Sequence, residues 1–228
     1  MREIVFDTET TGLRFAGGDR LIEIGCVEIV HRVETGRTFH AYVNPGREVH
    51  PDAFAVHGLS DVFLSDKPAF QHMVADLIDF IGDAPLVAHN AGFDFSFLNG
   101  ELSLCGHPPV CRTRMVDTLV LARSRHPGAK HTLDALCVRY GIDRSHRVLH
   151  GALLDAQLLS QVYVELTGGR QIGLGLAVED DVVEMVIDAP ARRVRPARVH
   201  AASAEELARH AAFIATLKEP VWGSAAFG

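Results

Sequence analysis

Short runs of hydrophobic residues, separated by polar turns, mark the first half of the chain. Runs rich in β-branched residues predict strands at residues 3–7, 21–30, 38–43 and 85–89, with a shorter strand at residues 115–116. Hydrophobic residues at helical spacing predict helices at residues 69–82, 94–105, 117–125, 132–140 and 151–167. Strands therefore dominate early and helices late, which predicts a single α/β domain.

The pattern changes after Gly169. Thr167, Gly168 and Gly169 predict the end of the last helix of the domain, and the residues that follow are first rich in glycine, then acidic, then basic. We therefore expect an α/β domain at residues 1–169 and a flexible linker at residues 170–202.

The end of the chain predicts one more helix. Ser203 and Glu206 have the spacing of a capping box, and apolar residues follow at helical spacing from Leu207 onwards. A short amphipathic helix beyond a linker, together with the only tryptophan, Trp222, suggests that residues 203–228 bind a partner. The alternative is that this helix packs back onto the α/β domain.

Composition limits the class of protein and its cellular compartment. A hydrophobic content of 47% is ordinary for a domain of this length that buries a sizeable core. The four cysteines have no CxxC spacing, so we expect reduced thiols rather than zinc ligands or disulfides. The sequence has neither a signal peptide nor a long apolar segment, so we expect a cytoplasmic protein that does not engage a membrane.

Acidic residues follow two of the predicted strands. Asp7 and Glu9 stand two apart at the end of the first strand, so their carboxylates point to the same side and can reach one cation or a close pair of cations. Asp94 would lie in the first turn of the helix that follows residues 85–89. Each residue alone also fits a simpler role, as a turn former or a helix-start acid.

A third acidic residue lies inside a helix. Asp155 is surrounded by leucines, and an aspartate in such a place requires a partner, which a metal ion supplies better than a surface salt bridge. His150 is close enough in sequence to serve the same site as a base, because its pKa is near neutrality. Because hard divalent cations prefer carboxylate oxygens, the acidic residues indicate a site for Mg²⁺ or Mn²⁺.

Three segments carrying these residues resemble the DEDDh family of 3′→5′ exonucleases, and within it the proofreading subunits of bacterial replicative polymerases. The segments are FDTETTG at residues 6–12, HNAGFDFSF at residues 89–97 and HGALLDA at residues 150–156. The resemblance implies a ribonuclease H-like fold, in which helices flank a mixed central sheet. It also implies a two-metal-ion nuclease in which Asp7, Glu9, Asp94 and Asp155 hold two Mg²⁺ or Mn²⁺ ions, His150 acts as general base, and the product is a 5′-mononucleotide.

The resemblance also implies substrate contacts. Asp7, Glu9 and Asp155 would meet the substrate through the metals, Thr10 beside them would contact the terminal sugar, and Asp52 and His57 would face the terminal nucleotide. The alternative for the last two is a short helix with Asp52 near its first turn and His57 before a glycine cap.

Partners follow from the same resemblance. The substrate would be DNA 3′ ends, single-stranded or mispaired, and a net charge of −7 suits an enzyme that holds few phosphates. The C-terminal helix would bind the catalytic (alpha) subunit of DNA polymerase III, and Gln171 to Leu176 would dock into the sliding clamp. Two other functions are weighed: a DEDDh ribonuclease for RNA ends or short oligoribonucleotides, and a non-catalytic tether, which the intact motif residues disfavour.

Overall fold

The computed structural model describes residues 1–145, 147, 149–169 and 201–218. The chain divides into two compact units, residues 1–176 and residues 177–228, and each is described by itself. None of the helices in these described residues is both long enough and apolar enough to cross a membrane. The predicted clamp-binding segment, Gln171 to Leu176, lies outside the described residues.

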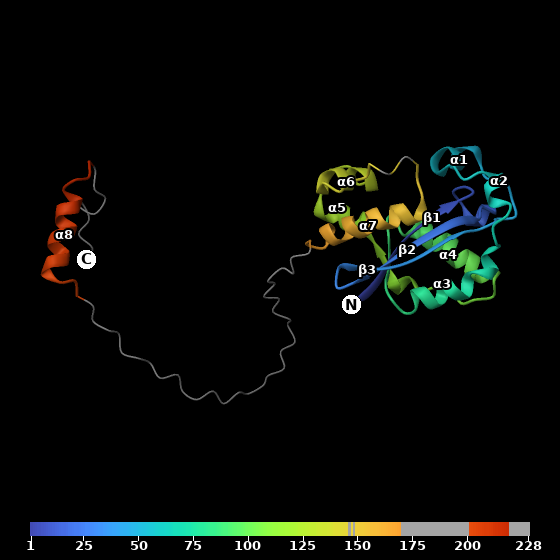
Figure 1. The fold of residues 1–228 in the computed structure, drawn as a ribbon, viewed down its shortest axis with the longest axis horizontal. Coiled ribbons are helices and arrows are strands. Elements are labelled where there is room, and N and C mark those ends of the chain that lie inside the picture. The colour runs from blue at the N-terminus through green and yellow to red at the C-terminus, as the bar shows by residue number, and fades with distance from the viewer. Residues whose placement is uncertain (146, 148, 170–200, 219–228) are drawn as a thin grey trace, which may run out of the picture. The chain divides into compact units, whose positions relative to one another are not determined.

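A five-stranded mixed sheet forms the centre of the first unit (Figure 1). Its strands lie in the order β3 (Val33–Tyr42), β2 (Leu21–Val30), β1 (Arg2–Thr10), β4 (Leu86–Ala88) and β5 (Met115–Asp117). β1 pairs antiparallel with β2 and parallel with β4, so it occupies the middle of the sheet. The expected mixed sheet of a ribonuclease H-like α/β fold is confirmed.

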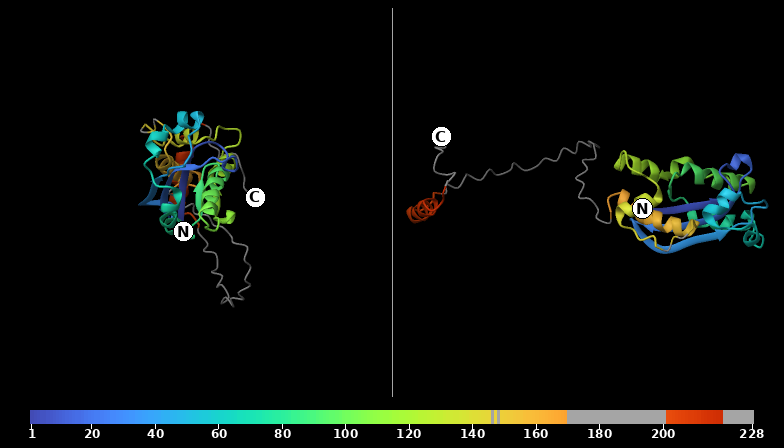
Figure 2. Two further views of the ribbon diagram at one scale, coloured as in Figure 1. Left: turned by 90° about the vertical axis from the view of Figure 1, so that its right-hand side faces the viewer. Right: turned by 90° about the horizontal axis from the view of Figure 1, so that it is seen from above.

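Helices cover both faces of the sheet, as Figures 1 and 2 show. The helices of the first unit are α1 (Pro51–His57), α2 (Asp61–Leu64), α3 (Val74–Ile81), α4 (Gly92–Leu104), α5 (Thr118–Arg125), α6 (Leu133–Tyr140) and α7 (Ala152–Leu166), with short 3₁₀ turns at Phe15–Gly17, Phe70–His72 and Arg112–Arg114. Side chains of α3 and α4 pack in one hydrophobic cluster with the sheet, and α7 packs on the opposite face. α5 and α6 pack in turn against α7.

The side chains of β1 alternate between these two layers, as the two-residue period of a strand requires. Ile4 and Phe6 are buried in the cluster that includes α3 and α4. Val5 packs instead in the cluster that includes α7, and the hydroxyl of Tyr163 in α7 donates to Glu3 Oε1 over 2.7 Å. Odd-numbered residues of β1 therefore face α7, and even-numbered residues face α4.

α7 approaches the sheet closely at one glycine. A Cβ atom at Gly25 of β2 would lie 2.3 Å from both Cα and N of Leu153, so only glycine fits there without a displacement of α7. Gly25 is the antiparallel partner of Asp7 in β1. The first turn of α7 is thereby brought against the sheet next to Asp7.

Two strands are longer than the sequence predicts. β1 continues to Thr10 rather than ending at residue 7, because its polar end still pairs with β2. β3 begins at Val33 rather than residue 38, because a two-residue turn at His31 and Arg32 returns the chain directly onto β2. Both turn residues have positive φ, 52° and 66°, a conformation usually supplied by Asn-Gly, so the sequence carried no hairpin signal.

The expected helix at residues 69–82 is shorter. Phe70–His72 form a 3₁₀ turn, and the α-helical part is Val74–Ile81. A tighter 3₁₀ turn is common where a helix starts, and the hydrophobic spacing of the sequence does not distinguish the two.

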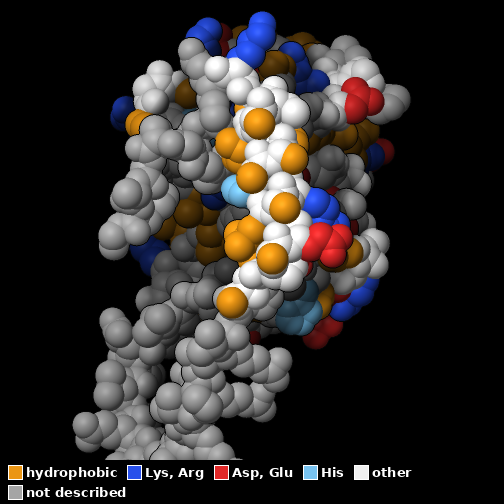
Figure 3. All heavy atoms as spheres, turned by 90° about the vertical axis from the view of Figure 1, so that its left-hand side faces the viewer, with side chains coloured by type: hydrophobic (Ala, Val, Ile, Leu, Met, Phe, Trp, Pro, Cys, Tyr) orange, Lys and Arg blue, Asp and Glu red, His pale blue; other side chains and the backbone are white. Residues whose placement is uncertain are grey.

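The second unit contributes one described helix, α8 (Ala204–Ile214), close to the predicted position. Ser203 Oγ accepts from the backbone of Glu206, and the Glu206 carboxylate accepts from Ser203 N, which confirms the predicted capping box. Figure 3 shows hydrophobic side chains along one side of this helix. Leu207 and Phe213 are exposed there.

Candidate active site

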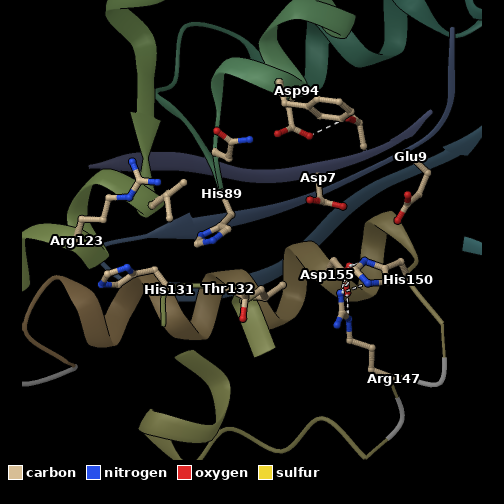
Figure 4. Close-up of a pocket in the computed structure, with 15 residues that line it drawn as sticks. Asp7, Glu9, His89, Asp94, Arg123, His131, Thr132, Arg147, His150 and Asp155 are labelled. Atoms are coloured by element: carbon tan, nitrogen blue, oxygen red, sulfur yellow. Dashed lines mark hydrogen bonds and ion pairs between the residues drawn. The ribbon is translucent and has the colours of Figure 1, made fainter. Parts of the chain in front are cut away.

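All five residues singled out by the motifs, Asp7, Glu9, Asp94, His150 and Asp155, line one cavity of about 490 Å³ (Figure 4). Asp7 and Glu9 are odd-numbered residues of β1, so they lie on the side of the sheet that α7 covers. The predicted shared face of these two carboxylates is therefore present in the fold.

Asp94 reaches the cavity from the first turn of α4. Asn90, between β4 and α4, has φ of 62°, a left-handed conformation that asparagine tolerates, and its N–H donates to Asp117 Oδ1 over 3.1 Å. Thr8, an even-numbered residue of β1, faces α4 and donates its hydroxyl to Asp94 Oδ1 over 2.7 Å. Thr8, which lies between Asp7 and Glu9 in β1, therefore fixes the third carboxylate near them.

Asp155 and His150 come from α7 and the loop before it. Asp155 lies one turn into α7 and is buried. His150 Nδ1 lies 3.2 Å from Asp155 Oδ2, and the backbone N–H of His150 donates to Val56 O at the other side of the site. Arg147 completes this group, because its guanidinium donates to both oxygens of Asp155.

The carboxylates on the β1 side repel one another. Burial raises the pKa of Asp7 well above its usual range, and the charges of Asp94 and Glu9 raise it further. Burial, followed by the charge of Asp155, raises the pKa of Glu9 to about 8. The pKa of Asp94 is also raised, chiefly by burial, although the Thr8 hydrogen bond works in the opposite direction.

Asp155 behaves differently. Burial by itself would raise the pKa of this carboxyl, but hydrogen bonds from His150 and Arg147 outweigh burial and lower it. The site thus holds one carboxyl whose pKa is lowered by its hydrogen-bond partners and three whose pKa values are raised.

This donor set fits divalent cations. One ligand atom each from Glu9, His150 and Asp155 can be chosen so that all lie within 4.8 Å of one another. Asp7 and Asp94 add further oxygens on the same cavity wall. A divalent cation would relieve the repulsion that raises the pKa values of these carboxyls, and oxygen-rich sites of this kind suit hard cations.

A second cavity, of about 570 Å³, adjoins the first and shares Thr8, Glu9 and Phe93 with it. The predicted substrate residues Thr10, Asp52 and His57 line it. Asp52 and His57 belong to α1, and Gly58 ends that helix in a left-handed conformation, so the short helix weighed as the alternative is present and also lines the second cavity. His57 Nε2 is buried and has no hydrogen-bond partner among the described residues.

Comparisons with known proteins place this site in a family. The model of a family described as "Exonuclease" matches residues 4–163. The chain is 47% identical over 222 residues to the DNA polymerase III subunit epsilon of Escherichia coli strain K12, covering 92% of this chain and 91% of that protein. It is 46% identical over 219 residues to the subunit of the same name from Rickettsia typhi, covering 94% and 96%.

The chain belongs to the family of DNA polymerase III epsilon subunits. Membership makes it a metal-dependent 3′→5′ exonuclease, as the motifs predicted. The family implies divalent metal ions, which agrees with the donor set described above.

Solved structures of related exonucleases share the epsilon-family fold. Exonuclease X in complex with 5′ overhanging duplex DNA matches with a TM-score of 0.56 and 26% identity, over 72% of this chain and 90% of that one. The nuclease domain of 3′hExo, a DEDDh family member bound to rAMP, matches with a TM-score of 0.63 over 73% and 91% of the two chains. At 17% identity the second likeness concerns the fold alone.

The sequence did not predict several residues of this epsilon-family site. Thr8 lies inside the FDTETTG segment, but its hydrogen bond to Asp94 depends on how α4 packs against β1. Arg147 precedes His150 by three residues in a polar loop, and nothing local indicates that it is buried against Asp155. Glu23, one of two buried acids in the largely apolar β2, did carry a signal, and its carboxylate lies 2.7 Å from His40 Nε2.

Proposed function

We propose that this chain is the proofreading subunit of a bacterial replicative DNA polymerase, which removes mispaired 3′-terminal nucleotides and releases 5′-mononucleotides. The observation that carries the proposal is that five motif residues meet in one cavity, in a chain that matches proteins named DNA polymerase III subunit epsilon over more than nine-tenths of its length. The relatives' name supports this function over the ribonuclease alternative.

We assign the metal ligands as follows, with Mg²⁺ or Mn²⁺ as the physiological ions. Asp7, Glu9 and Asp155 hold one ion, and Asp7 with Asp94 holds the other. Two bound ions supply Lewis acidity to the scissile phosphodiester and lower the pKa of an attacking water. The support for this assignment is the mutual repulsion of these carboxyls, which a divalent cation would relieve.

His150 is the proposed general base. Its contact with Asp155 holds the ring beside the proposed ligands, where an imidazole nitrogen can take a proton from a water molecule. The oxygen of that water bonds to phosphorus as the bond from phosphorus to the 3′ oxygen of the preceding nucleotide breaks. The phosphate therefore leaves with the terminal nucleoside.

The terminal nucleotide is proposed to occupy the second cavity. His57 Nε2 lacks a partner among the described residues, and burial lowers the pKa of this histidine, so a neutral ring remains to donate one hydrogen bond to a ligand. Thr10 and the exposed carboxylate of Asp52 line the same space and complete the proposed substrate contacts. Asp7, Glu9 and Asp155 reach the substrate through the metals.

The remaining proposals concern the domains and the partners. Residues 1–169 form the exonuclease domain, residues 170–202 a linker with a sliding-clamp motif, and residues 203–228 the element that binds the polymerase alpha subunit. The exposed Leu207 and Phe213 of α8 support the last assignment, because helices that dock in a groove use such apolar anchors. A cytoplasmic location follows from work at the replication fork.

One experiment tests the catalytic proposal. Release of single nucleotides is followed from the 3′ ends of matched DNA, mismatched DNA and RNA, with Mg²⁺, Mn²⁺ or chelator. We expect faster release from mismatched DNA, no release with chelator, loss of activity in Asp7→Ala, and a loss of about 10²- to 10⁴-fold in His150→Ala. Asp83→Ala, which removes an exposed carboxylate outside both cavities, is the matched control. A preference for RNA would favour the ribonuclease instead.

A further inference from the structure

The main cavity extends well beyond the carboxylates. Its far end is lined by Leu119 and Arg123 of α5 and by His131, Thr132 and Leu133 around the start of α6. Figure 4 shows Arg123 and His131 on one side of His89, and Glu9 and His150 on the other. The cavity thus has an acidic end and a separate end with basic side chains.

Arg123 differs from the other basic groups that line the cavity. Arg147 is bound to Asp155 and Asp134, and His150 is paired with Asp155. The side chain of Arg123, in contrast, makes no hydrogen bond or ion pair with any residue that the structure describes, and the residue is exposed. Its guanidinium is free to receive a ligand, although the protein as a whole carries a net charge of −7.

His89 lies between the two ends and adds no positive charge to either. Its Nδ1 lies 2.9 Å from Thr118 Oγ1, at the start of α5. Burial lowers the pKa of this histidine, so the ring stays neutral near pH 7. Arg123 supplies a permanent positive charge at this end of the cavity.

The direction of the substrate strand follows from the order of the two cavities, and this step rests on the proposed function. The terminal nucleoside occupies the second cavity, which meets the first at Thr8, Glu9 and Phe93. The scissile phosphate lies at the carboxylates. A strand that continues in the 5′ direction away from the second cavity then runs past His89 toward Arg123.

We propose that Arg123, beside His131, binds the phosphate of the next linkage on the 5′ side of the scissile one. A guanidinium can donate two parallel hydrogen bonds to a phosphate, and it is positively charged at every pH at which the enzyme works. The contact anchors a single strand of at least two linkages, so it gives the enzyme a preference for polynucleotides over esters of a single nucleotide.

The test is a cycle that combines a protein change with a substrate change. The proteins are the unaltered full-length chain, Arg123→Ala and Arg139→Ala. Arg139, exposed on α6 and outside both cavities, controls for the loss of one positive charge. The substrates are a thymidine oligonucleotide, the same oligonucleotide with a neutral methylphosphonate at the second linkage from the 3′ end, and the p-nitrophenyl ester of thymidine 5′-phosphate, which has no second linkage.

We expect Arg123→Ala to raise KM for the oligonucleotide about tenfold with kcat little changed, as the loss of one charged hydrogen bond predicts. The slope of log KM against log salt should fall by about 0.7, the value for one phosphate of a single strand. The methylphosphonate should raise KM of the unaltered protein and of Arg139→Ala but leave Arg123→Ala unaffected. The nucleotide ester should not distinguish the three proteins.

Two results would overturn the proposed Arg123 contact. The first is a methylphosphonate effect on KM that is the same for the unaltered protein and for Arg123→Ala. The second is a loss of Arg123→Ala activity on the nucleotide ester that is as large as its loss on the oligonucleotide. Failure of the unaltered protein to hydrolyse any of the substrates would instead contradict the proposed function. Binding of the same oligonucleotides, followed by fluorescence anisotropy with Ca²⁺ as the metal, examines the Arg123 contact without turnover and must show the same pattern.

Discussion

The guanidinium of Arg147 forms a bidentate ion pair with the carboxylate of Asp155, with Nε 2.5 Å from Oδ1 and Nη2 2.7 Å from Oδ2. Its third nitrogen, Nη1, donates to Asp134 Oδ1 of α6 over 2.8 Å. Both Arg147 and Asp155 are buried, with side-chain exposures of 7% and 4%. Arg147 therefore links α6 to α7 and uses oxygens of a carboxylate that we assign to a metal ion.

Replacement of Arg147 by alanine should lower the stability of the metal-free protein and raise its affinity for a metal ion. Loss of one partner of a buried ion pair leaves Asp155 uncompensated, so the metal-free protein should lose about 3–5 kcal/mol of unfolding free energy. The same uncompensated charge should bind Mn²⁺ more tightly, so the rise in Tm on adding Mn²⁺ should exceed that of the unaltered protein.

Thermal unfolding in EDTA and in a Mn²⁺ series measures both effects of Arg147→Ala. Arg144→Ala is the control, because Arg144 also donates to Asp134, over 3.0 Å, but in an exposed pair of little energetic weight. An equal Mn²⁺-induced rise in the two variants would show that Arg147 does not compete with the metal.

The metal-free protein should lose stability as pH rises. The pKa of Glu9 is raised to about 8, and those of Asp7 and Asp94 are raised as well, so these groups keep protons in the folded state that the unfolded chain releases above about pH 4. The unfolding free energy should therefore fall as pH rises from about 4 to about 8.

This pH dependence is measured by denaturant unfolding in EDTA across that range. Glu9→Gln, which removes one of the three groups, should flatten the decline, while Asp83→Gln, at an exposed position, should leave it unchanged. A metal-free protein whose stability rose from pH 5 to pH 8 would contradict the proposed repulsion.

Glu101 and Arg20 form an ion pair between α4 and the residue before β2, in which the carboxylate is buried and the guanidinium is half-buried. Arg20 Nε and Nη2 each lie 2.7 Å from a Glu101 oxygen, and the side chain of Glu101 has no exposed surface. Glu101→Ala should cost about 1–3 kcal/mol, because it leaves the Leu21 N–H and part of the Arg20 guanidinium without an acceptor. Urea unfolding of this variant is compared with Arg37→Ala, whose exposed guanidinium contacts Glu28 and should cost less than about 1 kcal/mol.

Gly25→Ala should weaken both folding and catalysis. The added methyl group would meet the backbone of α7 at Leu153, so α7 must shift, and overpacking of this kind costs about 1–3 kcal/mol. Because Asp155 is on α7 and Asp7 is opposite Gly25, the shift should also reduce kcat. Gly92→Ala, where a Cβ meets nothing within 4 Å, is the matched control for both measurements. Full activity of Gly25→Ala would mean that the site tolerates a displaced helix.

The sequence predicted the elements whose signal is local. β2 occupies residues 21–30 as expected, because a long apolar run bounded by polar residues identifies a buried strand without other information. The beginning of β3 was missed, because its exposed residues lack a hydrophobic pattern and the turn before it is made by His31 and Arg32. Pairing with β2 extends this strand, and no single segment encodes that pairing.

The same distinction applies to the site. The motifs predicted that Asp7, Asp94 and Asp155 meet, and the cavity contains all three. The basic side chains around them could not be found in this way, because the burial of Arg147 and the free guanidinium of Arg123 depend on how α5, α6 and α7 pack. Their roles remain predictions for the experiments above.

The alternation of β1 between its two layers has a consequence for how the enzyme acquires activity. If β1 paired with its neighbours one residue out of register, Asp7 and Glu9 would point into the apolar layer that now contains Ile4 and Phe6. Ile4 and Phe6 would then point out of that layer. The free energy that selects the correct register is therefore the burial of the hydrophobic core. The pairing that buries the core also places Asp7 and Glu9 in the cavity, so stably folded molecules in which β1 is paired out of register should not accumulate.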